Sequence, residues 1–142
     1  MTNRRKRRNQ GRFAGIPLSV MESDLYVQLN NLAKILLYEL CGQYNGGNNG
    51  YLSLTRNQLK ERGINSPEAT KKAIENLISA GFITRTRQGG AAKGKAICSL
   101  YAINWQPIDE KRDKPLENYF TFKGAFGLWF KERSNKIPML KR

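Results

Sequence analysis

The pattern of apolar positions changes from helical to strand-like along the chain. Apolar residues at positions 32, 33, 36, 37 and 40 share one helical face, which predicts a helix that begins at Asn30 or Asn31. Residues 82–87 and 97–105 are instead rich in β-branched and aromatic side chains, which predicts two strands. We therefore expect an α+β fold.

Short polar signals mark the ends of further elements. Ser19 or Ser23 is expected to begin a short helical stretch that reaches position 28. Thr55 is expected to cap a helix over 56–62, and Ser66 followed by Pro67 predicts the start of a helix over 67–80. The glycine- and asparagine-rich segment 42–50 predicts a turn, 51–54 a short strand, and 89–96 a flexible basic loop too long for a tight hairpin.

This order of elements is that of a winged helix-turn-helix, in which a three-helix core is followed by a β-hairpin wing. The sequence also resembles the winged-helix DNA-binding proteins of phages, plasmids and integrated mobile elements over roughly Phe13 to Asp109. The resemblance is carried by residues 17–21, 36–40, 43–46, 48–50, 80–83, 86–90, 100–102 and 105–109. It implies a DNA-binding protein of a mobile element. Our leading hypothesis is a protein that binds double-stranded DNA sequence-specifically and regulates transcription.

The helix over 67–80 is the predicted recognition helix for the major groove. Its apolar side, with Thr70, Ile74, Leu77, Ile78 and Gly81, is expected to face the core, with Ala73 on a flank. The candidate DNA-binding residues on its polar side and flank are Ser66, Glu68, Ala69, Lys71, Lys72 and Asn76. An ordinary solvated helix face is the alternative interpretation of the same pattern.

Positive charge dominates the chain, with a formal net charge of +14 and no histidine. Segments 1–12 and 55–104 each carry +6, 105–142 carries +4 and 13–54 carries −2. Such an excess favours nucleic acid or an anionic membrane surface as a partner. The first segment contains the predicted basic arm of Arg4, Arg5, Lys6, Arg7 and Arg8, for which a merely solubilising tail is the alternative.

Cations within the predicted wing, residues 85–96, are candidates for contacts to the DNA backbone or minor groove. These are Arg85, Arg87, Lys93 and Lys95, and Arg56 on the preceding helix adds a candidate phosphate contact. A solvated loop without a ligand is the alternative.

Several classes of chemistry are not expected. Without histidine there is no Ser-His-Asp or Cys-His catalysis, and Cys41 and Cys98 are too far apart in sequence for a clustered thiolate metal site. The stretch from Gly89 to Ala96 differs from a P-loop at one residue, because Ala96 stands in place of Ser or Thr. We expect no enzyme activity, no cofactor, no metal and no membrane span, and a location in the bacterial cytoplasm at the nucleoid.

The predicted organisation is a flexible basic arm over 1–12, a winged-helix domain over 13–106 and an aromatic C-terminal extension over 107–142. The extension is expected to pack on the domain or on a second copy, or to bind a host or phage protein. A homodimer through the first predicted core helix, 30–40, or through the extension fits a palindromic site. Two alternatives to a transcription regulator stay open: a replication or DNA-processing accessory protein, and an inhibitor of a host nucleic-acid machine.

Overall fold

The computed structural model describes residues 11–92 and 94–117, and within them the chain is α+β. The helices are α2 (Leu18–Met21), α3 (Asp24–Gln28), α4 (Asn31–Gln43), α5 (Arg56–Glu61) and α6 (Pro67–Ser79). The strands are β1 (Leu52–Ser53), β2 (Ile83–Arg87), β3 (Gly90–Ala92), β4 (Lys95–Ile97) and β5 (Leu100–Ile103). The mixed α+β class is therefore as the sequence predicted.

Four helices begin at side-chain caps that the sequence signals. The side chains of Ser23, Asn30, Thr55 and Ser66 accept a hydrogen bond from the backbone N–H three residues later, which satisfies a donor that the helix leaves free. The exception is α2, which begins after Pro17 with no side-chain cap, so the alternative start at Ser19 is wrong. The caps fix where α5 and α6 begin.

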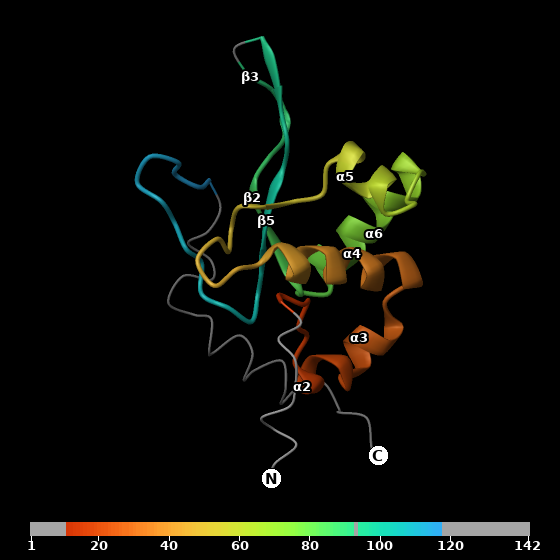
Figure 1. Ribbon diagram of the computed structural model, residues 1–142. Helices are drawn as coiled ribbons and strands as arrows, with labels where there is room; N and C mark the ends of the chain where they lie inside the picture. Colours follow the sequence, from red (N-terminus) through yellow and green to blue (C-terminus); the bar gives the residue numbers. More distant parts are fainter. Residues whose placement is uncertain (1–10, 93, 118–142) are drawn as a thin grey trace.

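The strands form two antiparallel sheets. One has the order β1-β5-β2, and the other pairs β3 with β4. β3 follows β2 and β4 precedes β5, so the two pairs make up one long hairpin that projects away from the helices (Figure 1). The prediction of an unpaired loop over 89–96 is wrong, since three residues of each arm are paired in register, from Gly90 with Ile97 to Ala92 with Lys95. Residues 93–94 join them, so the hairpin is tight.

The core lies between α4, α6 and the three-stranded sheet. Ala33, Leu36, Leu37 and Leu40 of α4 are completely buried, as the apolar stripe predicted. On α6 the buried residues are Ala73, Ile74 and Leu77, whereas Thr70 and Ile78 are only partly buried. The placement of Ala73 on a flank is therefore wrong: it is the smallest of the three, and it lets α4 and α6 approach closely.

The packed unit continues beyond the boundary predicted at residue 106. The backbone N–H of Asp109 donates to the Asn49 carbonyl at 2.9 Å, and that of Glu117 donates to the Thr86 carbonyl at 2.8 Å. Leu116 is buried, and a Cβ added to Gly50 would lie 2.7 Å from its Cδ1. Residues 107–117 therefore contact both the loop before β1 and strand β2, and the folded domain includes them.

Asn49 is the polar centre of these contacts. Its side chain is completely buried, and its Nδ2 donates to the carbonyls of Ile103, Gln106 and Pro107 at 2.9, 3.0 and 3.1 Å. Its Oδ1 accepts from the Ile103 N–H at 2.8 Å. One amide thus fastens the loop before β1 to the end of β5 and to the segment that follows.

Candidate nucleic-acid interface

The N-terminal end of α6 lies at the surface. The Ser66 hydroxyl accepts from the Ala69 N–H at 3.2 Å, and Thr70 Oγ1 donates to the Ser66 carbonyl at 2.8 Å. Ser66, Pro67, Glu68 and Ala69 are all exposed. This turn therefore presents its side chains outward, and the unpaired N–H groups of a helix start carry partial positive charge there.

The predicted polar face of α6 is exposed except at one position. Lys71 and Lys72 are exposed in the second turn, and they point to different sides because neighbouring residues are about 100° apart on a helix. Asn76 is only half-exposed, and its Oδ1 accepts from the Asn30 N–H at 3.5 Å. Asn76 therefore lies against the start of α4 and not on the free face.

Two arginines of β2 have different environments although both were candidate backbone contacts. The Arg87 guanidinium donates to the Cys98 carbonyl through Nε at 3.1 Å and Nη2 at 2.7 Å. Arg85 instead stacks on Tyr101, with its guanidinium carbon 5.6 Å from the ring centroid, and its buried Nε has no hydrogen-bond partner among the described residues. Arg87 is thus hydrogen-bonded within the hairpin, whereas the Arg85 Nε has no such partner among the described residues.

The far end of the hairpin is exposed, and apart from Lys95 its described residues are small. Ala91, Gly94, Lys95 and Ala96 are all exposed. Gly94 has a φ of +75°, a left-handed conformation that glycine adopts without strain. The ammonium group of Lys95 is therefore carried away from the body of the protein. Lys93 and the basic arm Arg4–Arg8 lie outside the described residues.

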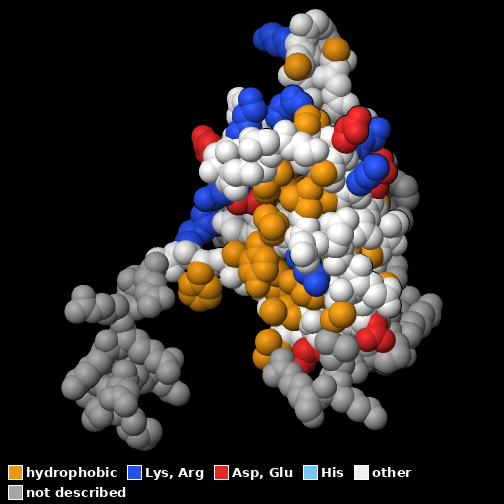
Figure 2. Space-filling model, turned by 90° about the vertical axis from the view of Figure 1, so that its right-hand side faces the viewer, with side chains coloured by type: hydrophobic (Ala, Val, Ile, Leu, Met, Phe, Trp, Pro, Cys, Tyr) orange, Lys and Arg blue, Asp and Glu red, His pale blue; other side chains and the backbone are white. Residues whose placement is uncertain are grey.

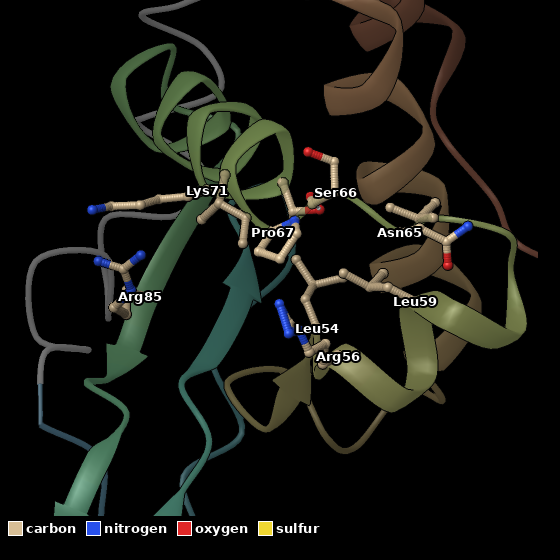
Figure 3. Close-up of a pocket in the computed structure, with 11 residues that line it drawn as sticks. Leu54, Arg56, Leu59, Asn65, Ser66, Pro67, Lys71 and Arg85 are labelled. Carbon is tan, nitrogen blue, oxygen red and sulfur yellow. Dashed lines mark hydrogen bonds between the residues drawn. The ribbon is translucent and has the colours of Figure 1, made fainter.

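A pocket of about 220 Å³, here called the α5–α6 pocket, opens between α5, the start of α6 and β2. Its charged lining comes from Arg56, Lys71 and Arg85, one from each of these elements (Figure 3). Leu54, Leu59 and Ile74 form apolar walls. Asn65 and Ser66 add polar groups, and Asn65 is a residue that the sequence analysis did not single out. The sequence feature that could have identified Asn65 is its position in the turn, immediately before the α6 cap.

Basic side chains gather at the end of the molecule that bears this pocket and the hairpin. Figure 2 shows Lys and Arg over the upper part of the face, with some acidic side chains between them and hydrophobic side chains exposed below. Arg62, at the end of α5, forms an ion pair with Glu39 of α4 across 2.5 Å. Its charge is therefore partly neutralised within the protein.

Several large apolar side chains elsewhere on the domain are exposed. Ile35 and Tyr38 of α4 lie off the buried stripe and are 48% and 43% exposed. The aromatic part of the C-terminal extension, 118–142, lies outside the described residues, so its expected packing stays a prediction. Phe13 is 84% exposed.

The titratable groups with a shifted pKa lie in the core and not at this interface. Burial raises the pKa of the Cys41 thiol to about 12, so it is neutral and unreactive in the folded protein. Burial also raises the pKa of Tyr26 and Tyr44. Within residues 11–92 and 94–117, no three acidic or cysteine side chains come together as metal ligands would. The helices of the same part are all too short and too polar to cross a membrane.

Comparison with known proteins gives no family assignment. No family model matches the chain, and no curated protein or solved structure is significantly similar to it.

Proposed function

We propose that this protein is a sequence-specific double-stranded DNA-binding protein with a winged-helix domain, in which α5 and α6 form the helix-turn-helix and the β2–β5 hairpin is the wing. The observation that carries the proposal is the exposed start of α6 beside a pocket lined by three cations. A projecting hairpin lies next to these helices (Figure 1). All three features lie at one end of the molecule.

The dimensions of α6 suit a major groove. With 13 residues at ~1.5 Å each, it is about 20 Å long, and its N-terminal half presents an exposed polar face. Ser66, Glu68, Ala69 and Lys72 are the side chains of this face that we assign to base edges. Lys can donate to guanine O6 and N7, and Glu can accept from the amino group of cytosine.

The backbone contacts are assigned to cations that flank the helix. Arg56, Lys71 and Arg85 lie in the α5–α6 pocket, and Lys95 lies at the end of the hairpin. Phosphate contacts of this kind set position and affinity, while contacts to bases set sequence preference. The role as a transcription regulator of a phage or mobile element rests on the resemblance described above.

Selection of binding sites from random duplex DNA tests the proposal. We expect one enriched motif, palindromic if the protein binds as a dimer. Lys72→Ala should relax the preference at one base pair by about 1–3 kcal/mol, because it removes a base contact. Lys111→Ala is the matched control, since Lys111 stacks on Tyr51 away from α6.

Failure to enrich any motif at moderate salt contradicts sequence-specific binding and favours the alternative of an inhibitor that acts on a host protein. An enriched motif that maps to a replication origin and not to promoters favours the replication alternative. An unchanged preference in Lys72→Ala removes this residue from the base contacts.

A further inference from the structure

We propose that the α5–α6 pocket is a binding site for a phosphate group, either a backbone phosphate of duplex DNA or a free phosphate-bearing ligand. The first source deepens the proposed function and rests on it. Phosphate binding as such does not, because it requires only the pocket.

Three cations line this pocket, and they come from different elements of the chain. Arg56 is the first residue of α5, Lys71 lies in the second turn of α6, and Arg85 is in the middle of β2. In Figure 3 the ends of Lys71 and Arg85 extend to the same side, and Arg56 lies below Pro67 and Leu54. The fold thus gathers like charges that repel one another unless an anion lies among them.

No acidic residue compensates this charge. The lining contains no carboxylate, and none of the three cations forms an ion pair within the described part of the chain. Arg62, only a few residues from Arg56, does have such a partner in Glu39. The pocket is therefore a place where the protein leaves positive charge unneutralised although it pairs a neighbouring arginine.

Arg85 gives the second, independent observation. Its side chain is half-buried and held against Tyr101, and its buried Nε lacks an acceptor. A buried donor without a partner is unfavourable, and a fixed guanidinium is already ordered for a planar, two-pronged contact. Arg87, two residues further on, donates to the Cys98 carbonyl through both Nε and Nη2. Of the two arginines, the one that faces the pocket is the one left for a ligand.

The size and lining of the pocket favour a phosphate group over a larger ligand. Its volume of about 220 Å³ is below the ~300–1,000 Å³ of pockets that enclose drug-sized molecules. Leu54, Leu59 and Ile74 lower the local polarity, which strengthens charge-assisted hydrogen bonds. Several cations around one centre suit a group with several charged oxygens.

Titration of the full-length chain with inorganic phosphate, at constant ionic strength in chloride, tests the site directly. We expect saturable NMR shifts of the Arg85 side-chain Nε–H and of the amides around Ser66. Lys71→Gln should weaken phosphate binding about tenfold by removing one charged donor. The matched control is Lys60→Gln, which makes the same change at an exposed lysine of α5 outside the pocket lining, and should alter binding by less than about twofold.

Arg85→Lys separates a specific contact from loss of fold. It retains the positive charge but removes the guanidinium fork, which is the group that stacks on Tyr101. We expect weaker phosphate binding with an unchanged melting temperature. Shifts that do not saturate, or equal weakening in Lys71→Gln and Lys60→Gln, overturn the proposal.

Duplex binding then identifies the source of the phosphate. If it belongs to DNA, Lys71→Gln weakens binding equally for all sequences and lowers the salt slope by ~0.9, while the preferred motif stays the same. If it belongs to a free ligand, Lys71→Gln loses inorganic phosphate but keeps duplex affinity and slope. If the wild-type chain binds phosphate but enriches no duplex motif, the proposed function is contradicted. The proposal of a phosphate site in the pocket then still holds.

Discussion

The two halves of the long hairpin differ in how they are held. The base, β2 with β5, lies in the three-stranded sheet, and all four residues of β5 are buried. The tip, β3 with β4, has exposed residues on both strands and pairs with no other strand. The base is thus fixed by the core, whereas the tip is held by its own ladder and by its connection to the base. A hairpin that is rigid at one end and free at the other can reach a partner without disturbing the core.

The junction between base and tip is where the register changes. Arg85 pairs with Tyr101 and Arg87 with Leu100, so a bulge lies between the two arginines. Gly89 follows, and its N–H donates to Ser99 Oγ at 2.8 Å. Bulges bend a strand and re-aim its side chains. This bulge gives Arg85 and Arg87 the different partners described above.

The largest loss of stability should come from removing the Asn49 side chain, whose hydrogen bonds hold the base of the hairpin. Asn49→Ala removes the amide that bonds both the N–H and the carbonyl of Ile103 at the end of β5, and leaves buried backbone groups unpaired. We expect a loss of about 3 kcal/mol in the free energy of unfolding, measured by urea denaturation.

The matched control is Asn57→Ala, because Asn57 is exposed on α5. It should change stability by less than about 0.5 kcal/mol. Equal losses in the two variants contradict the view that Asn49 holds the base through its buried hydrogen bonds.

The caps of α3, α4, α5 and α6 were predictable because each depends on residues three apart in sequence. Asn49 was not, since its side-chain partners are 54 to 58 residues away and a run of turn-forming residues only indicates a loop. The paired tip was missed for a related reason. Gly and Lys favour loops, but once the base fixes the spacing of the two arms, the ladder continues past the junction.

The candidate site, too, could be predicted from the sequence only where it depends on local patterns. Exposure of Ser66, Glu68, Ala69 and Lys72 follows from the helical period, which the sequence contains. In a regular strand Arg85 and Arg87 share a face, and only the bulge, a feature of the pairing with β5, separates them. The α5–α6 pocket combines three elements, so no local pattern predicts it.

A smaller effect should follow from a change at the junction. A Cβ added to Gly89 would lie 2.6 Å from the Ser99 backbone nitrogen and 3.0 Å from the Ile97 carbonyl oxygen. Gly89→Ala must therefore move one arm, and we expect a loss of about 1–3 kcal/mol. Thermal unfolding measures the loss, and amide NMR shifts of Ala91 and Lys95 measure the displacement of the tip.

Gly47→Ala serves as the control, because the only atom within 4 Å of a Cβ there is Asn45 Oδ1 at 3.8 Å. It should leave both stability and the tip resonances nearly unchanged. If Gly89→Ala leaves the shifts at Ala91 and Lys95 as they are, the tip is not positioned by the junction.

The smallest effect on stability is expected at the tip itself, where only binding should respond. Lys95 is exposed, so Lys95→Gln should change the free energy of unfolding by less than about 0.5 kcal/mol. If its ammonium contacts a phosphate, the slope of log affinity against log salt should fall by ~0.9 for every duplex sequence. Lys111→Gln removes the same charge from a site distant from the hairpin and should leave the slope unchanged. A slope that falls equally in both variants means that the tip contributes general positive charge, and the comparison of base and tip then concerns stability alone.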